Sequence, residues 1–249
     1  MNATNSMELF DAHIHSEGRS VEELKKMSEN GIKKALTCAF YPIQPKYGET
    51  LIDLFRKLVE FESYRGKKAG MRIYAAVGIH PRCIPPNWRD VIEFMETDFG
   101  YVAFGEIGLE DGDEREIEVL KSQLMLAKRL DVPCIIHTPR RNKKVITEKI
   151  LKILEEISFP EDLALIDHVS FETFEMIREK NYHIGLTVQP GKLSVEDAVE
   201  IINKYGDEKI VANSDTGFSE SDMLAVRKLY DACRNLKVTS ENAEKFLRI

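Results

Sequence analysis

Most histidines of this chain lie where a short apolar segment ends. The chain has six histidines among its 249 residues. Five share this position: His13, His15, His80, His137 and His168. A single histidine at a strand end usually packs in the core, but five at equivalent positions favour a metal site, since neutral imidazole is a common metal ligand. The sixth, His183, begins a predicted strand at the opposite end, so we assign it to structure.

Spacing and neighbouring carboxylates add to this prediction. In an extended chain, residues i and i+2 point to the same side, so His13 and His15 can hold one cation together. Glu106 and Asp215 also follow apolar strand-like segments, where an unpaired charge is costly unless it meets a cation. These donors suffice for two divalent ions bridged by a shared carboxylate and a water. Mixed nitrogen and oxygen ligands fit Zn, Mn, Ni or Mg.

The segments that must position these residues alternate between two patterns. Eight short apolar segments are typical of parallel strands buried on both faces: residues 7–13, 32–38, 72–78, 101–106, 132–137, 162–168, 182–188 and 208–214. Apolar residues at three- or four-residue steps predict helices over residues 20–30, 48–64, 88–97, 116–130, 143–158, 171–180, 194–205 and 219–236, with a short terminal one over 240–247. Ser194, which opens S-V-E-D after a Gly-containing loop, predicts a capped helix start.

Eight strands that alternate with eight helices predict an α/β fold of the (β/α)8 type, the TIM barrel. The carboxyl ends of the strands converge on one face of such a barrel, which would bring the histidines together. A length of 249 residues fits one barrel, and no repeat or linker divides it, so we expect a single domain over residues 1–249. A doubly wound open sheet is the alternative, because periodicity does not reveal closure.

Composition narrows the partners and the location. The formal net charge of −7 argues against an extended surface for duplex DNA or an anionic membrane, but not against a nucleic-acid end that reaches a pocket. No apolar run approaches the roughly 20 residues needed to span a bilayer, and residues 1–6 are polar, without a signal region. The four cysteines lie far apart and form no C-x-x-C, which favours a reduced, cytoplasmic protein without membrane partners.

Short motifs in a fixed order cover nearly the whole chain. They are D-A-H-I-H at 11–15, G-I-H-P at 78–81, G-E-I-G-L-E at 105–110, I-H at 136–137, D-H at 167–168 and S-D at 214–215. This set resembles the TatD family of metal-dependent hydrolases, which belongs to the amidohydrolase superfamily of barrels. The resemblance implies two metal sites with a shared carboxylate: His13, His15, Glu106 and Asp215 for one ion, and Glu106, His137 and His168 for the other.

The resemblance also implies roles in the reaction. His80 would contact the substrate rather than a metal, and Asp215 would take the proton from the attacking water. Related phosphotriesterase-like enzymes bridge their metals with a modified lysine on strand four, but residues 101–109 contain no lysine. The bridge expected here is therefore the carboxylate of Glu106.

Several motifs depart from the family pattern. T-P-R follows His137 where Ser-Arg is usual, H-V-S stands for H-C-F at His168, and N-S-D-T-G replaces E-T-D followed by Pro at Asp215. An acidic run over 110–116 takes the place of a frequent aromatic residue. We expect it to be a solvated loop, and the alternative is that it adds a metal ligand. Because the metal set is intact and its surroundings differ, we expect the reaction type to transfer better than the substrate.

Basic residues near the strand ends are candidates for contact with an anion. Arg140 and Arg141 open the run R-R-N-K-K before a predicted helix, where cations oppose the helix dipole unless an anion joins them. Arg82 follows H-P and is a further candidate. A solvated basic loop is the alternative for 140–144. Trp88 is assigned to packing at a helix start rather than to base stacking.

These features predict a metal-dependent hydrolase that uses a metal-activated water. The leading interpretation is a phosphoesterase, and the resemblance implies a deoxyribonuclease that acts on DNA ends. Asp215 and Glu106 would be its catalytic residues. One alternative keeps the metals but cleaves a C–N bond, or a lactone or ester C–O bond, in a small molecule. Another is a non-enzymatic binding scaffold. Motifs of serine hydrolases, P-loop proteins and dinucleotide-binding proteins are absent from the sequence.

Overall fold

The computed structural model describes residues 8–249 of the chain. Residues 1–6 and Met7, at which the sequence predicts the first strand to begin, lie outside the described residues. By its internal contacts the chain divides into two compact units. Unit 1 holds residues 8–37, 62–74 and 186–249, and unit 2 holds residues 38–61 and 75–185. The expectation of a single domain over 1–249 stays a prediction.

All eight predicted strands are present, and they follow chain order in one sheet. Their bounds are β1 Leu9–Ile14, β2 Ile32–Cys38, β3 Arg72–Val77, β4 Ala103–Gly108, β5 Cys134–His137, β6 Ala164–Ile166, β7 His183–Thr187 and β8 Ile210–Asn213. The pairs β1–β2 and β3 through β7 are parallel. Parallel strands in chain order, alternating with helices, define the predicted (β/α)8 barrel class, whereas a doubly wound sheet would require a reversal of strand order.

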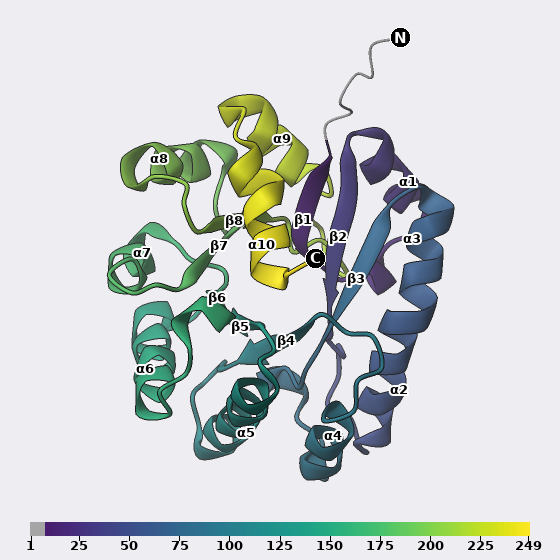
Figure 1. Cartoon of the computed structure of the whole chain (residues 1–249), viewed down its shortest axis with the longest axis vertical. Helices are drawn as coiled ribbons and strands as arrows, with labels where there is room; N and C mark the ends of the chain where they lie inside the picture. Colours follow the sequence, from purple (N-terminus) through teal and green to yellow (C-terminus); the bar gives the residue numbers. More distant parts are fainter. Residues whose placement is uncertain (1–7) are drawn as a thin grey trace. The chain divides into compact units, whose positions relative to one another are not determined.

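The helices lie between the strands, as the periodicity predicts (Figure 1). Their bounds are α1 Val21–Glu29, α2 Glu49–Lys57, α3 Ser63–Ala69, α4 Trp88–Met95, α5 Glu114–Leu130, α6 Lys143–Glu156, α7 Phe171–Ile177, α8 Val195–Tyr205, α9 Ala225–Cys233 and α10 Asn242–Leu247. The Ser194 cap is confirmed, since its hydroxyl accepts the Asp197 amide at 3.0 Å. Within residues 8–249, no helix combines the length and apolar character needed to cross a bilayer.

Two helical segments differ from the predicted ones. The segment 48–64 contains a π-helical turn, Leu58–Glu62, which joins α2 to α3. Helix α9 begins at Ala225 rather than at 219. Before it, the Ser221 hydroxyl donates to the Ser219 carbonyl and the Asp222 carboxylate accepts the Leu224 amide. Such local side-chain bonds compete with the helix and delay its start.

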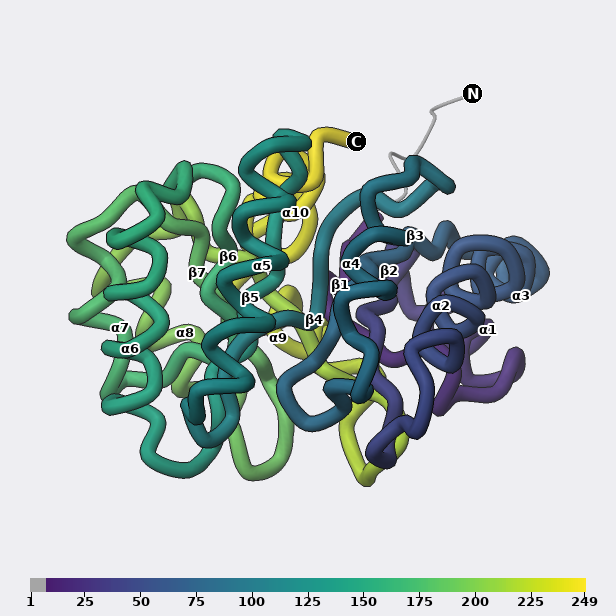
Figure 2. Tube along the Cα trace, turned by 90° about the horizontal axis from the view of Figure 1, so that it is seen from below, coloured from purple at the N-terminus to yellow at the C-terminus, as the bar shows by residue number. Residues whose placement is uncertain are grey.

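Unit 1 has its apolar core against β1 and β2. Leu9 lies opposite Ile32 in the parallel pairing, and Leu24 of α1 packs with both in one buried cluster. Helices α1 and α3 lie side by side in this unit (Figure 2). Strand β8 lies next to β1, and a bridge joins Ile14 to Thr216 just beyond the strand ends. This neighbourhood brings together residues that are about 200 positions apart in the sequence.

Unit 2 positions the ends of strands β4, β5 and β6 beside one another. Phe104 pairs with Cys134, and Cys134 pairs with Ala164, so the three strands are aligned from their buried starts. Helix α5 packs against β4, and α6 packs against α7 (Figure 1). Because the strands are parallel, the residues that end them lie at the same edge. The sixth histidine, His183, begins β7 and lies at the other edge, as predicted.

Candidate metal centre

Unit 1 gathers three of the predicted donors, and we call His13, His15 and Asp215 the first cluster. His13 lies in β1, His15 directly follows that strand, and Asp215 follows β8. The Asp215 Oδ1 atom lies 3.2 Å from His15 Nε2 and 3.7 Å from His13 Nε2. One ligand atom of each residue lies within 4.8 Å of the other two. The two imidazoles thus face one carboxylate oxygen, as the i, i+2 spacing predicts.

Backbone bonds fix Asp215 against β1. Its amide donates to the His13 carbonyl at 2.9 Å, and the His15 amide donates to the Thr216 carbonyl at 2.7 Å. The φ of Asp215 is 47°, in the left-handed region. A Cβ at Gly217 would lie 2.6 Å from the Cβ of His15, so glycine is required for this close approach. The glycine in N-S-D-T-G therefore makes room for a donor histidine.

A buried carboxyl supports the first cluster from behind. Asp11 is fully buried; its Oδ1 accepts the Ser214 amide at 2.9 Å, and its Oδ2 accepts the Ser214 hydroxyl at 2.6 Å. Burial raises the pKa of Asp11 to about 7, although the bonds from Ser214 oppose this rise. These contacts hold the residue before Asp215 in place.

Two residues that the sequence analysis did not identify also reach Asp215. Both lie in the loop after β7. The Gln189 amide donates to the backbone carbonyls of Ser214 at 3.2 Å and Asp215 at 2.9 Å. The Lys192 ammonium donates to Asp215 Oδ2. The carboxylate thus directs one oxygen to the histidines and the other to a lysine.

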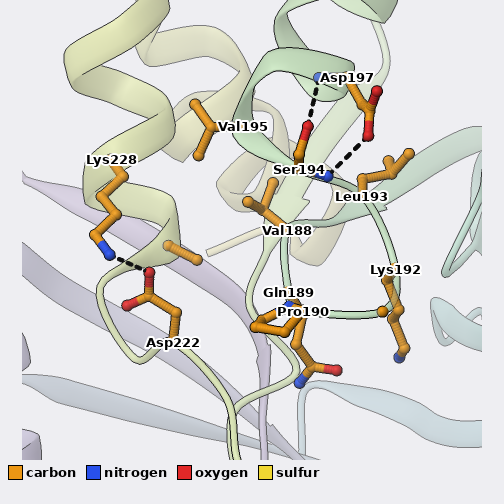
Figure 3. Close-up of a pocket in the computed structure, with 12 residues that line it drawn as sticks. Val188, Gln189, Pro190, Lys192, Leu193, Ser194, Val195, Asp197, Asp222 and Lys228 are labelled. Carbon is orange, nitrogen blue, oxygen red and sulfur yellow. Dashed lines mark hydrogen bonds and ion pairs between the residues drawn. The ribbon is translucent and has the colours of Figure 1, made fainter.

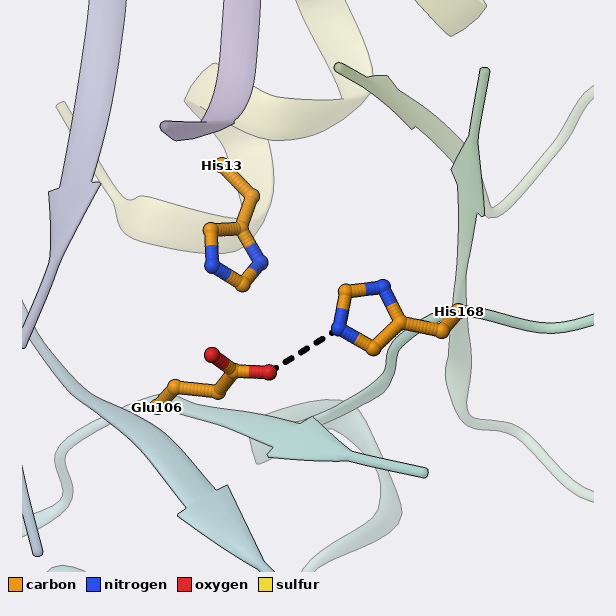
Figure 4. A group of neighbouring side chains, drawn as sticks. All are labelled: His13, Glu106 and His168. Carbon is orange, nitrogen blue, oxygen red and sulfur yellow. Dashed lines mark hydrogen bonds and ion pairs between the residues drawn. The ribbon is translucent and has the colours of Figure 1, made fainter. Parts of the chain in front are cut away.

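Unit 2 gathers the other three predicted donors and the predicted substrate contact His80, and we call His80, Glu106, His137 and His168 the second cluster. Glu106 lies within β4, His137 ends β5, and the two other histidines follow β3 and β6. Glu106 Oε1 lies 2.6 Å from His137 Nδ1 and 2.9 Å from His168 Nε2, the latter contact drawn in Figure 4. Glu106 Oε2 lies 3.7 Å from His80 Nε2. The Glu106 carboxylate is 3% exposed, so three imidazoles surround a buried charge.

The ends of β5 and β6 are linked through the basic run. Lys143, the first residue of α6, donates to the Thr138 hydroxyl at 3.1 Å and to the His168 carbonyl at 2.7 Å. His168 has a φ of 59°, and its amide donates to Asp167 Oδ1 at 2.8 Å. A Cβ at Gly185 would lie 2.1 Å from that oxygen, so β7 needs glycine here. The lysine thus fixes the backbone of a donor histidine.

The acidic run after β4 is only in part the solvated loop that we expected, since Asp111, Asp113 and Glu114 are exposed. Glu110 Oε2 lies 3.0 Å from His137 Nε2, so this carboxylate extends the second cluster. Glu116 is buried, and its Oε2 accepts the amides of Glu110, Asp111 and Gly112 at 2.9, 3.0 and 2.7 Å. The run differs from the expectation at its two ends, because Glu110 contacts His137 and the carboxylate of Glu116, in the first turn of α5, binds the loop's amides in place of water.

Opposing effects set the protonation of this pair. Burial by itself would lower the pKa of His137, but the Glu106 and Glu110 carboxylates outweigh it and raise the pKa above its ordinary value. The hydrogen bond with His137 holds the pKa of Glu110 below its ordinary value, against its partial burial. The protonated ring of His137 can therefore donate from Nδ1 to Glu106 and from Nε2 to Glu110.

The predicted anion contacts lie in different surroundings. The Arg82 amide donates to His80 Nδ1 at 3.0 Å, and its guanidinium lies 5.6 Å from the centre of the Phe40 ring. Arg140 and Arg141 are exposed and precede α6. Their contact with substrate stays a prediction. Trp88 is the buried first residue of α4, which confirms its assignment to packing.

The donors of both clusters fit a divalent cation. Each cluster combines imidazole nitrogens with a carboxylate, the mixed donor set that Zn, Mn, Ni and Mg accept. Within each cluster, three ligand atoms lie within 4.8 Å of one another: those of His13, His15 and Asp215, and those of His80, Glu106 and His137. Burial makes these carboxylates costly unless a cation or proton compensates them. His80 thus lies among the donors of the second cluster, and the resemblance implies that it contacts the substrate.

Imidazoles and carboxylates at the strand ends of a (β/α)8 fold form a candidate metal centre, as expected for a metal-dependent hydrolase. A family model described as TatD related DNase matches residues 10–242. The chain belongs to this family and is a TatD-like metal-dependent hydrolase, which confirms the resemblance seen in the motifs.

Similar proteins agree with this assignment. An uncharacterized metal-dependent hydrolase of Methanocaldococcus jannaschii is 39% identical over 97% of this chain and 100% of its own. The crystal structure of a TatD-like protein from Archaeoglobus fulgidus has 53% identity and a TM-score of 0.87, and covers 96% of this chain and 100% of that one. A phosphotriesterase homology protein from Escherichia coli, 11% identical, shares the fold with a TM-score of 0.69 over 98% of this chain and 99% of its own.

Proposed function

We propose that this chain hydrolyses phosphoesters, with the end of a DNA strand as its substrate. The carrying observation is the pair of buried nitrogen and oxygen donor clusters at strand ends in a chain of the TatD related DNase family. A phosphodiester is anionic, and the net charge of −7 includes neither bound cations nor protonated histidines. The outer surface can thus be acidic while the metal centre attracts an anionic substrate.

The proposed cofactors are two divalent metal ions. His13, His15 and Asp215 would hold one, and Glu106, His137 and His168 would hold the other. The expectation that Glu106 also reaches the first ion stays a prediction. When bound, divalent ions lower the pKa of a water towards about 7 and stabilise negative charge in phosphoryl transfer.

The chain's own residues supply proton transfer and orientation. Asp215 takes the proton of the attacking water, for which an ionised carboxylate is suited. Lys192 holds its second oxygen and so orients the group. His80 Nδ1 accepts the Arg82 amide, so the proton of the neutral ring lies on Nε2. That atom faces Glu106 and can donate to a substrate oxygen. Glu106 orients His137 and His168 through short contacts.

The test is hydrolysis by the metal-loaded protein. The substrates are bis(p-nitrophenyl) phosphate, end-labelled single-stranded DNA and a lactone. Asp215→Asn should lower kcat on the phosphodiesters at least about 100-fold, since a general base contributes about 10²–10⁴-fold. Glu220→Gln, an exposed acid in the same loop, is the control and should keep the wild-type rate.

The outcomes separate the competing functions. Loss of turnover in Asp215→Asn with metal content retained supports the proposal. An unchanged rate would refute the role of Asp215 as base. Cleavage of the lactone without cleavage of either phosphodiester would replace the proposal with C–O bond hydrolysis. No metal bound under replete conditions would favour a binding scaffold.

A further inference from the structure

Unit 1 contains a pocket beside the first cluster. Its volume is about 410 Å³, within the range of about 300–1,000 Å³ that small-molecule sites occupy. The loop after β7, the start of α8 and the start of α9 form its walls (Figure 3). Much of the lining is apolar: Val188, Pro190, Leu193, Val195 and Ala225. The pocket therefore suits an uncharged organic group.

Two lysines line the pocket, and their surroundings differ. The Lys228 ammonium lies 2.5 Å from the Asp222 carboxylate, and its side chain is 59% exposed. The Lys192 side chain is 11% exposed, and its ammonium contacts Asp215. Figure 3 shows Lys228 reaching Asp222 on the opposite side of the pocket from Lys192. Only Lys192 of these two thus connects the pocket to a proposed metal ligand.

The loop that carries Lys192 is anchored to the first cluster. The Lys192 amide donates to the Gln189 carbonyl at 2.9 Å, which closes a turn. The Gln189 side chain donates to the Asp215 carbonyl at 2.9 Å. Both residues line the pocket. One edge of the pocket is therefore fixed relative to Asp215.

The acidic residues of the pocket are engaged locally. Asp197 Oδ2 accepts the Ser194 amide at 3.0 Å in the helix cap, and Asp222 binds Lys228. Asp197 is thus held in the helix cap, and the charge of Asp222 is paired with a lysine. The positive charge of Lys192 lies nearest the cluster.

We propose that this pocket is the substrate subsite of the reaction centre. The Lys192 ammonium contacts the substrate's phosphoryl group, and the pocket holds the compact organic group attached to it, of the size of a nucleoside. The inference rests on the proposed function, since it assigns the substrate of that function. Three observations carry it: a cationic side chain in contact with the proposed base, a partly apolar cavity of about 410 Å³ that this side chain lines, and a loop anchored to both.

Binding to metal-loaded protein tests the phosphate contact. Titration calorimetry with inorganic phosphate should show at least about tenfold weaker binding for Lys192→Met, because the variant loses a charge-assisted hydrogen bond to the phosphate. Lys192→Arg should restore most of the affinity. Lys228→Met should weaken binding by less than about threefold, because surface ion pairs and remote charges contribute little. Metal content should equal wild type in all three variants, whereas a purely structural role of Lys192 at Asp215 would lower it.

A second arm tests the pocket itself. Thymidine 5′-monophosphate should bind more tightly than inorganic phosphate to the wild type. Val195→Phe narrows the pocket and should remove that advantage while leaving the affinity for inorganic phosphate unchanged. Near-UV circular dichroism verifies that each variant folds.

Failure of the subsite and failure of the function give different results. If the wild type cleaves phosphodiesters but Lys192→Met binds phosphate as tightly as the wild type, the subsite proposal is overturned and the function stands. The subsite is also overturned if Val195→Phe keeps the nucleotide advantage. If the wild type cleaves no phosphodiester while the binding losses appear as expected, the proposed function fails and the anion subsite is supported.

Discussion

Glu116 supports the second cluster indirectly, through the loop that carries Glu110. Its replacement should destabilise that loop without removing a residue of the cluster. Its Oε2 accepts three consecutive amides, those of Glu110, Asp111 and Gly112. Glu110 in turn contacts His137. Replacement of Glu116 by Ala removes the acceptor and leaves the amides to find other partners.

The loss in free energy of unfolding depends on how far water can reach each of the three amides. Gly112 is buried, so its amide loses a partner that water does not readily replace, at about 1–3 kcal/mol. Glu110 is half-buried and Asp111 is exposed, so each lost bond costs about 0.5–1 kcal/mol. The expected loss in free energy of unfolding for Glu116→Ala is about 2–5 kcal/mol. Glu116→Gln keeps one acceptor oxygen and loses the charge, so it should cost about 1–2 kcal/mol.

Urea unfolding followed by circular dichroism measures this loss. The matched control is Glu118→Ala on the same helix, whose carboxylate is 53% exposed and pairs with Arg89 at the surface. Such a pair contributes about 0–1 kcal/mol. Equal unfolding midpoints for Glu116→Ala and Glu118→Ala would refute the argument that the loop depends on this carboxylate.

Three further predictions concern the cap, the metals and a buried acid. Ser194→Ala should lower the free energy of unfolding by about 1 kcal/mol in urea unfolding, because the α8 cap is lost; an unchanged midpoint would contradict it. Chelation of the metals should lower Tm by about 5–10 °C in calorimetry, as expected for ligand at about 100 times its Kd, and Mn²⁺ should restore it; equal Tm values would count against the metal sites. Because the pKa of Asp11 is raised to about 7 in the folded protein, the protonated carboxyl stabilises the fold relative to the unfolded chain. This contribution to the free energy of unfolding is fully present below about pH 4 and is lost as pH rises through about 7. In chelator, Asp11→Asn should therefore gain stability over wild type between pH 5 and 8, by as much as about 4 kcal/mol; a pH-independent difference would contradict this.

The elements of the fold follow from the sequence because their signals are local. Apolar runs mark every strand, and strand order follows once parallel strands alternate with helices. The boundaries were less certain where side chains compete with the backbone, as Asp222 does before α9. The π-helical turn at 58–62 gave no signal, because periodicity at three or four residues does not resolve one added residue.

The candidate site was only partly accessible to the same reasoning. Histidines at strand ends and the H-x-H spacing indicated the donors, since strand geometry fixes their direction. Glu110 was weighed only as part of the acidic run over 110–116, and Lys192 was not identified, because their contacts depend on loop conformations set by Glu116 and Gln189. The signal available for both was their place in a loop that follows a strand, β4 for Glu110 and β7 for Lys192, which does not say where a long side chain points.

Unit 1 joins segments from both ends of the chain, so its proposed metal ligands are synthesised far apart in time. The residues of the second cluster are synthesised closer together. His13 and Asp215 share a backbone hydrogen bond, yet about 200 residues separate them. At about 5–20 residues per second, the ribosome needs about 10–40 s to add that length. All four residues of the second cluster, which lie between 80 and 168, are made within this interval. A nascent chain that stops between 168 and 215 therefore carries the complete donor set of the second cluster and lacks the carboxylate of the first.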